Sequence, residues 1–376
     1  FGDIDAQAYP YLAAFGEFDL VQTWIPNPDG PVYAVEVDEN NDLVYAGGNF
    51  SNIGGQPRNN MAALLAYVGF PSGAATAWNP GPDDFVSAIE IAGGVLYVGG
   101  NFDNISGSAR GKAASFAIPA FSLNAWNPAL NGAVYAIETS GSNVFLGGDF
   151  TGRLAKVDNI MGMPSVFPTA NATVRALQVI GNRLFVGGDF TALGSVARKF
   201  LGAVNTADNS VDAVFNPNLD QSVRSLAAYF CKLIVGGDFT TVNSVSQAGV
   251  ALINKDANIS IAGPLGICQG GSATLTVVGS GISEYYWCHN GSTTASVTVS
   301  PTTTTTYSVT VKTSDGCIYT LTRTLSVTPL PDAESAVIAD QALCGAGNIQ
   351  LGFDPPLADH DYVWSPAVGL DDPNSH

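Results

Sequence analysis

The feature that most constrains the fold is a four-residue motif, Gly-Gly-(Asn/Asp)-Phe, which occurs five times between positions 47 and 239. The first glycines of the five copies are Gly47, Gly99, Gly147, Gly187 and Gly236. Consecutive copies are 52, 48, 40 and 49 residues apart. An aromatic residue close to a proline precedes each copy, as in Trp78-Asn79-Pro80. A repeat of this length is a property of the whole architecture and is interpreted before any local pattern.

Each unit also contains two short apolar segments around a tight turn. In the second unit they are Val86–Ile89 and Leu96–Val98, separated by Ala92-Gly93-Gly94. Segments that are apolar almost throughout predict strands buried on both faces. A period of this size with about four strands per unit is typical of a β-propeller blade. We therefore expect an all-β fold in which residues 1–257 form a propeller of four-stranded blades.

The beginning of the chain falls inside this repeat. When Phe1 is aligned with Phe50, residues 1–15 run against residues 50–64 without a gap. Residues 1–23 are thus expected to be the second half of a blade, with its first two strands encoded upstream. The propeller is then expected to have at least six blades.

The composition changes near Ile259, where Ser and Thr become frequent. Short segments of alternating hydrophobicity follow, and Trp287 lies between Cys268 and Cys317. A Cys…Trp…Cys arrangement over about seven short strands is typical of an immunoglobulin-like sandwich. We expect such a module over residues 258–331, with Trp287 in its core and a Cys268–Cys317 disulfide. A second, incomplete copy is expected over residues 332–376, where Cys344 and Trp364 repeat the spacing.

These motifs resemble a known group of proteins. The succession of aromatic-Asn-Pro, Val-x-Ala-Ile and Leu-(Phe/Tyr)-Val-Gly-Gly-Asp-Phe resembles the delta-sixty repeats of large secreted bacterial proteins. The segments Ile267–Ser272, Ser300–Tyr307, Asp315–Cys317 and Trp364–Leu370 resemble immunoglobulin-like (PKD-like) modules of Bacteroidetes surface proteins. The resemblance implies a secreted or cell-surface protein exported by the type IX system.

Composition excludes several functions. The chain has 32 Asp and Glu against 14 Lys and Arg, a net charge of −18, so we expect no nucleic-acid partner. It has no run of about 18 apolar residues, so no membrane-spanning helix is expected. All three histidines lie at or after His289, and no catalytic or Cys-x-x-Cys motif occurs. We expect no catalytic residue, metal or cofactor, and we interpret Cys231 as a free buried residue.

The third residue of the motif is polar in every unit and is the candidate binding position. Five such residues, one per blade, are expected to surround one end of the axis. The set is Asn49, Asn101, Asp149, Asp189 and Asp238. They bind a cation or a polar ligand, or each side chain hydrogen-bonds its own turn. The phenylalanines that follow are expected to be structural wedges between blades: Phe50, Phe102, Phe150, Phe190 and Phe239.

A second polar set is less regular. Glu36, Glu90 and Glu138 occupy one position, which Gln178 and Ala227 fill in later units. Because the pattern is lost halfway, we expect a local acidic patch and no ring.

Together these observations predict a non-enzymatic extracellular protein with a structural, adhesive or partner-binding role. The propeller would be the interaction platform for a protein or glycan at the cell surface, and the immunoglobulin-like modules would be spacers. Three alternatives stay open. They are a glycan-binding, lectin-like propeller, a carboxylate-based glycosidase or lyase, and a subunit of a larger surface assembly such as a filament or a type IX export complex.

Overall fold

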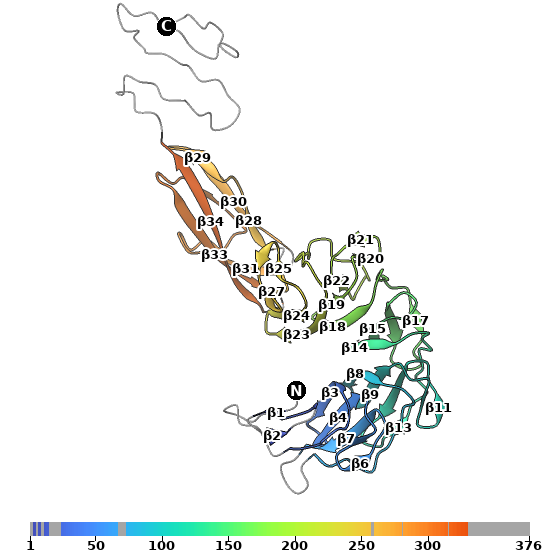
Figure 1. The fold of residues 1–376 in the computed structure, drawn as a ribbon. Helices are drawn as coiled ribbons and strands as arrows, with labels where there is room; N and C mark the ends of the chain where they lie inside the picture. The colour runs from blue at the N-terminus through green and yellow to red at the C-terminus, as the bar shows by residue number, and fades with distance from the viewer. Residues whose placement is uncertain are drawn as a thin grey trace, which may run out of the picture. The chain divides into compact units, whose positions relative to one another are not determined.

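The computed structural model describes residues 3–4, 7–8, 11–14, 24–66, 73–256, 259–279, 281–314 and 316–329. The chain divides into two compact units, Phe1–Asn258 and Ile259–His376. Every regular element within the described residues is a β-strand (Figure 1), which confirms the all-β expectation. The same residues contain no helix that is long and apolar enough to cross a membrane.

Within its described residues the first unit contains five antiparallel sheets of three or four strands, which follow one another in chain order from blue to yellow in Figure 1. The first sheet is β3 (Val32–Asp38), β4 (Leu43–Gly48) and β7 (Met61–Leu65). The second is β8 (Val86–Ala92), β9 (Val95–Gly100), β12 (Ala113–Ala117) and β13 (Ser122–Leu123). The third is β14 (Val134–Ser140), β15 (Asn143–Gly148), β16 (Leu154–Asp158) and β17 (Pro164–Ser165). The fourth is β18 (Val174–Ile180), β19 (Arg183–Gly188) and β22 (Leu201–Asn205), and the fifth is β23 (Val223–Tyr229), β24 (Lys232–Gly237) and β27 (Val250–Asn254).

The expectation of four strands per blade is correct for the second and third sheets and wrong for the other three as described. In the first and fourth sheets the segment in the fourth-strand position makes only one bridge to the third strand. These bridges are Leu64↔Ala75 and Val204↔Val211. A single bridge is too short to form a strand, so the outer edge of these sheets is a loop. A total of six or more blades stays a prediction.

Two-stranded hairpins follow the Gly-Gly motif and lie beside the main sheets. They are β5 (Asn52–Ile53) with β6 (Gln56–Pro57), β10 (Asn104–Ile105) with β11 (Ser108–Ala109), β20 (Ala192–Leu193) with β21 (Val196–Ala197), and β25 (Thr241–Val242) with β26 (Val245–Ser246). At the chain start, β1 (Asp3–Ile4) pairs with β2 (Gln7–Ala8). Aligning Phe1 with Phe50 places β1 and β2 on β5 and β6; the half-blade stays a prediction.

The paired glycines have two different structural roles. The first glycine faces the next sheet, where the valine that starts the first strand covers it; these pairs are Gly47–Val86, Gly99–Val134, Gly147–Val174 and Gly187–Val223. The second glycine lies against the backbone that enters the first strand of its own sheet, as Gly100 does against Phe85. A β-carbon at either position would overlap those atoms, so both glycines are required by close approach.

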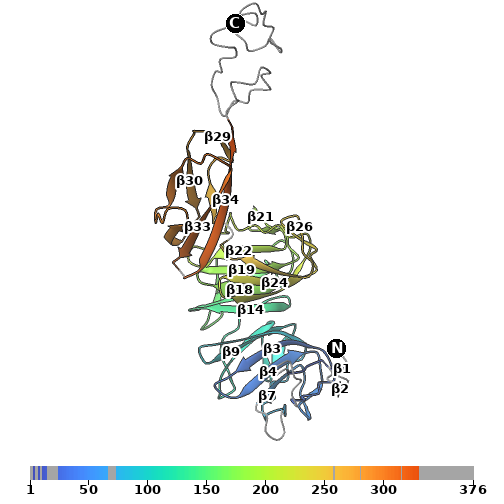
Figure 2. The same ribbon diagram turned by 90° about the vertical axis from the view of Figure 1, so that its left-hand side faces the viewer.

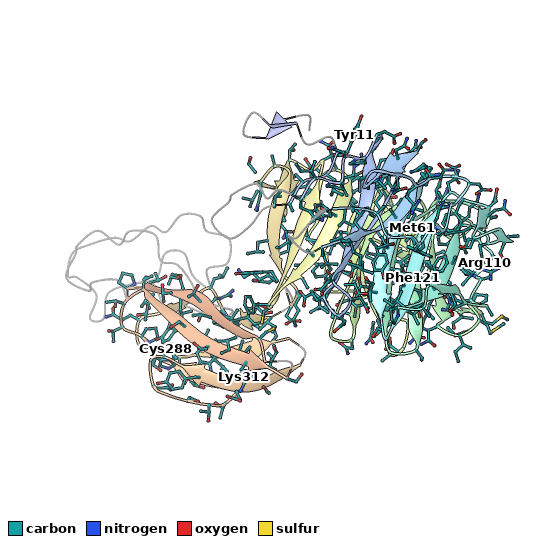
Figure 3. All side chains as sticks on the ribbon, turned by 90° about the horizontal axis from the view of Figure 1, so that it is seen from below. Tyr11, Met61, Arg110, Phe121, Cys288 and Lys312 are labelled. Atoms are coloured by element: carbon teal, nitrogen blue, oxygen red, sulfur yellow. The ribbon has the colours of Figure 1, made fainter. Side chains whose placement is uncertain are left out.

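The phenylalanines of the motif are buried, with exposed fractions of 0 to 4%. Side chains from adjacent sheets share continuous apolar clusters. In one of them, Met61 of the first sheet packs with Leu96 and Phe116 of the second, and Phe121 packs against the same cluster (Figure 3). The core of this unit therefore lies between sheets, as the apolar strands predict.

The second unit is a two-layer sandwich. One sheet is β28 (Ser260–Ala262), β30 (Ala273–Val278) and β32 (Ser296–Val299). The other is β29 (Gly266–Cys268), β34 (Ile318–Thr328), β33 (Thr305–Thr313) and β31 (Ile282–Trp287), with the long strands β33 and β34 side by side (Figure 2). Trp287 is fully buried in the shared core, and its indole N–H donates to the carbonyl of Thr294 at 3.0 Å. Residues 332–376, where a second module was expected, lie outside the described residues.

Disulfide bonding involves more cysteines than the sequence suggested. Cys231, Cys268 and Cys317 are all disulfide-bonded, so the interpretation of Cys231 as a free residue is wrong. A single Cys268–Cys317 bond does not account for three bonded cysteines. Cys288 is a free, exposed thiol (Figure 3). Cys231 lies in the turn between β23 and β24 and not within a strand. Periodicity could not identify it as bonded, because a repeat position alone does not show whether a thiol has a partner.

Candidate functional site

The strongest candidate site lies where the first strands of the five sheets begin. These strands, β3, β8, β14, β18 and β23, pack side by side in chain order. The second residue of each strand is polar or aromatic; the set is Tyr33, Ser87, Tyr135, Arg175 and Arg224. Antiparallel pairing, such as Val174 with Gly188, places the polar residue of the motif at the same end. We call these two sets of residues together the strand-start face.

Ion pairs dominate this face in the fourth and fifth sheets. The guanidinium of Arg175 donates to both carboxylate oxygens of Asp189, at 2.6 to 2.9 Å. Ser222, from the fifth sheet, donates its hydroxyl to the same carboxylate at 2.6 Å. Partial burial acts to raise the pKa of Asp189, but the hydrogen bonds from Arg175 and Ser222 outweigh it and lower the pKa. In the fifth sheet Arg224 pairs with Asp238 at 2.6 Å, and both side chains are about half exposed.

The other three motif positions have weaker partners. Asn101 donates its side-chain amide to Asp84 at 2.7 Å. Asp149 accepts a long hydrogen bond from Thr173 at 3.5 Å and pairs with Arg153 at the same distance. No side-chain hydrogen bond joins Asn49 to another described residue. The five positions therefore follow the second strands of their sheets, and several bond to side chains outside their own turn. A ligand-binding role for them stays a prediction.

Aromatic side chains complete the face. Tyr33 and Phe85, from the first and second sheets, contact each other edge to face with centroids 6.0 Å apart. The guanidinium of Arg175 lies over the ring of Tyr135 at 5.9 Å. Tyr33 is 53% exposed, so its ring is available to a partner. The face thus joins amphipathic rings to charged groups that are already held in place by ion pairs.

A row of carboxyl groups lies farther along the same strands. Thr139 donates to Glu90 at 3.2 Å, Gln178 donates to Glu138 at 3.4 Å, and Ala228 N–H donates to Gln178 at 3.0 Å. Burial raises the pKa of Glu90 to about 7, with repulsion from Glu36 adding to it. Burial and repulsion from Glu90 raise the pKa of Glu138 to about 8. The expected acidic patch is thus a continuous row in which two carboxyls hold protons near neutral pH. Among the described residues no group of ligands is arranged to hold a metal ion.

Sequence reasoning missed one set of recurring polar residues. Each accepts a hydrogen bond from a backbone N–H just after the motif phenylalanine of its unit; the set is Asp29, Asp83, Asn131, Asn171 and Asp220. Asp83, for example, accepts from the N–H groups of Asp103 and Asn104 at 2.8 and 3.0 Å. Their constant place, 19 to 21 residues before the motif phenylalanine, was a visible signal in the sequence. They hold the hairpin loops and carry no separate site.

Comparisons with known proteins agree with the propeller interpretation of the fifth repeat. A family described as "Domain of unknown function (DUF5122) beta-propeller" matches residues 232–258, which include β24 and β27. No curated protein matches the chain.

Several solved structures are similar to this chain, all at low sequence identity and with low TM-scores. The computationally designed Ika8 protein is 13% identical with a TM-score of 0.41, over 77% of this chain and 83% of that chain. The extracellular domain of the putative hybrid two component system BT3049 from B. thetaiotaomicron is 13% identical with a TM-score of 0.39. That match covers 80% of this chain and 44% of the B. thetaiotaomicron chain. KlHsv2 with loop 6CD replaced by a Gly-Ser linker is 9% identical with a TM-score of 0.38, over 72% of each chain. The family match thus lies within the fifth repeat of the first unit.

Proposed function

We propose that the protein is a non-enzymatic binding module outside the cell or at the cell surface, and that the strand-start face contacts a protein partner. The observation that carries the proposal is the connected set Tyr135, Arg175, Asp189 and Ser222, which crosses from the third sheet to the fifth. Tyr and Arg are the side chains that most often dominate protein interfaces. Ion pairs formed before binding reduce the ordering that binding requires.

The chemistry of the face supports binding more than catalysis. No histidine occurs before His289, so the first unit contains no imidazole for proton transfer. The best-defined carboxylates of the face, Asp189 and Asp238, are each engaged by an arginine. A glycosidase needs one protonated and one ionised carboxyl on opposite sides of a substrate. Glu90 and Glu138 instead lie in one row with raised pKa values.

An extracellular setting is supported by the disulfide-bonded cysteines, because such bonds persist mainly in oxidising compartments. Within the proposal the sandwich of the second unit is an immunoglobulin-like spacer. Further blades would complete the propeller, and a type IX export route of the Bacteroidetes kind would deliver the protein. Sequence upstream of Phe1 and downstream of His376 would test these parts.

Binding to intact cells tests the function. Tyr33 and Tyr229 are both 53% exposed, but they lie at opposite ends of their first strands. Labelled 376-residue protein would be titrated onto cells of the source bacterium and measured by flow cytometry, alongside Tyr33→Ala, Arg224→Glu and the matched control Tyr229→Ala. We expect the first two variants to weaken binding at least tenfold and the control to bind normally. Equal losses in all three, or no binding by the unmodified protein, would refute the proposal.

A further inference from the structure

An open surface pocket of about 480 Å³, which we call the cavity, lies on the outer rim of the fourth sheet. Its walls are the segment that enters that sheet, the hairpin turn between β20 and β21, and the turn after β22. The lining includes Phe167, Pro168, Ser195, Asp208 and Val211. Its volume lies within the range of ~300–1,000 Å³ typical of small-molecule sites.

The equivalent position of the second sheet is filled by an aromatic side chain. Phe121 lies eight residues after Ala113, which pairs with Gly99; Asn209 lies eight residues after Leu201, which pairs with Gly187. Phe121 and Asn209 are therefore equivalent, and both have a left-handed backbone, with φ of 56° and 60°. In the second sheet the ring of Phe121 stacks on Trp78, the corner aromatic residue, at 4.9 Å and 23°.

In the fourth sheet the corresponding ring is missing from the turn. The corner aromatic residue is Phe167, which lines the cavity and is held from behind by Phe145 at 5.5 Å. Asn209 also lines the cavity, but it has no ring to stack on Phe167 and its side chain is held by hydrogen bonds. Its amide donates to the carbonyl of Val166 at 3.2 Å and accepts from Lys156 at 3.0 Å. The cavity thus occupies the position that a stacked ring fills in the second sheet.

Polar groups at the edge of the cavity restrict the kind of ring. The Asp208 carboxylate accepts from Ser210 through Oδ1, which leaves Oδ2 without a hydrogen bond to any described residue. The hydroxyl of Ser195 is equally without a partner in the described part of the chain. No Lys, Arg or His is among the lining residues, so the cavity does not suit a phosphate or another anion.

We propose that this cavity binds one sugar ring of a neutral glycan, stacked on Phe167 in the place that Phe121 occupies on Trp78. A sugar ring has an apolar C–H face, which matches Phe167, Pro168 and Val211. Its hydroxyl groups lie around the edge, where the Asp208 carboxylate can accept hydrogen bonds and the Ser195 hydroxyl can donate or accept them. The site lies apart from the strand-start face and goes beyond the function proposed for that face.

The test is binding of neutral oligosaccharides to the full 376-residue protein. Cello-, xylo-, manno- and N-acetylated chito-tetraose would be screened by saturation-transfer NMR, and ligands found there titrated by calorimetry. Asn209→Phe would supply the missing ring, and Phe121 shows that this backbone accommodates it. Ser195→Trp would block the cavity from the hairpin side. The matched control is Ser244→Trp, at the equivalent turn of the fifth sheet.

We expect at least one oligosaccharide to bind, with affinity lowered at least tenfold by Asn209→Phe and by Ser195→Trp and unchanged by Ser244→Trp. Melting temperatures of all variants would confirm folding, and Ser195→Trp keeps the test valid if Asn209→Phe does not fold. Failure of all four oligosaccharides to bind, or binding unaffected by both cavity variants, would overturn the proposal. Stronger binding of phenol than of any oligosaccharide would also overturn it in favour of an aromatic ligand. Cell binding by the cavity variants separates this result from the strand-start proposal.

Discussion

A methyl group of Val134 lies directly over the α-carbon of Gly99, so that a β-carbon on Gly99 would be only 2.6 Å from Val134 Cγ1. The same relationship recurs between each of the first four sheets and the next one. It explains why the repeat tolerates variation in length but retains its glycine pair.

The contact predicts a position-dependent cost for the same substitution. Gly99→Ala should destabilise the first unit by about 1–3 kcal/mol, since the added methyl must displace a β-branched side chain in a packed core. The matched control is Gly236→Ala, at the equivalent position of the fifth sheet, where the neighbour is the hydroxyl of Ser225. Because a hydroxyl can rotate away, we expect a smaller cost there. Urea unfolding would compare the two, and equal costs would contradict the valine–glycine explanation.

The row of glutamates predicts that stability depends on pH. The pKa of Glu138 rises on folding from an ordinary value of 4.5 to about 8, and that of Glu90 rises to about 7. The folded state therefore holds protons that the unfolded state releases, so stability is greatest below pH about 4.5 as far as these groups are concerned and falls as pH rises to about 8. Glu138→Gln, which copies Gln178, should remove much of this loss.

Thermal melts between pH 5 and 9 would measure the effect. At pH 8.5 we expect Glu138→Gln to be more stable than the unmodified protein, on the order of 1–2 kcal/mol after allowance for solvent screening. Glu39→Gln, at an exposed turn position, is the control and should keep the original pH dependence. A Glu138→Gln profile parallel to that of the unmodified protein would show that the row does not hold protons.

Two arginines predict costs of different size for the loss of an ion pair. Arg183 pairs with Asp212 and Asp256, which are largely buried, and its guanidinium lies over the ring of Phe215 at 5.5 Å. Arg183→Met should cost about 3–5 kcal/mol because it leaves the largely buried Asp212 carboxylate without its cation, whereas Asp256 keeps its ion pair with Lys255. Arg224→Met removes a pair that is about half exposed and should cost about 1 kcal/mol or less. Chemical denaturation would rank them, and a reversed order would be inconsistent with the burial of the two pairs.

The recurring Asp and Asn residues before the hairpins predict that the two residue types are interchangeable. Asp220 accepts from the N–H groups of Thr240 and Thr241 at 2.8 and 3.0 Å. Asn171 makes the same bonds to Thr191 and Ala192. Asp220→Asn should therefore leave amide hydrogen exchange in β25 and β26 unchanged, while Asp220→Ala should accelerate it at Thr240 and Thr241. Faster exchange in the asparagine variant would show that charge, and not geometry, holds the loop.

The sequence predicted the elements that depend on repetition. Five coincident copies located the strands of the first unit, and the glycine pair predicted close packing, because only close approach explains two adjacent glycines in an apolar strand. The fourth strands were predicted less well. The fourth sheet has a single bridge at Val211, and the second sheet has a two-residue strand at Ser122–Leu123. These pairings differ by one residue, and strand propensity does not distinguish them. The strand-start ion pairs were missed because Arg175 and Arg224 replace tyrosine or serine in the earlier units. The cavity was missed because it depends on the absence of a ring at Asn209, which is visible only once the turns are superimposed.

The valine–glycine contact also has a consequence for how such a chain changes length. Each contact between neighbouring sheets is formed by the same two surfaces, the glycine of one sheet and the valine of the next. The glycine side of any of the first four sheets therefore fits the valine side of any later sheet. Excising the segment between two successive glycine pairs would bring Gly47 against Val134 in place of Val86, and the joint would have the same shape. Gain or loss of a whole unit therefore requires no compensating substitution. Gain or loss of part of a unit would instead place a side chain at the glycine position, where the neighbouring valine leaves room only for a hydrogen atom.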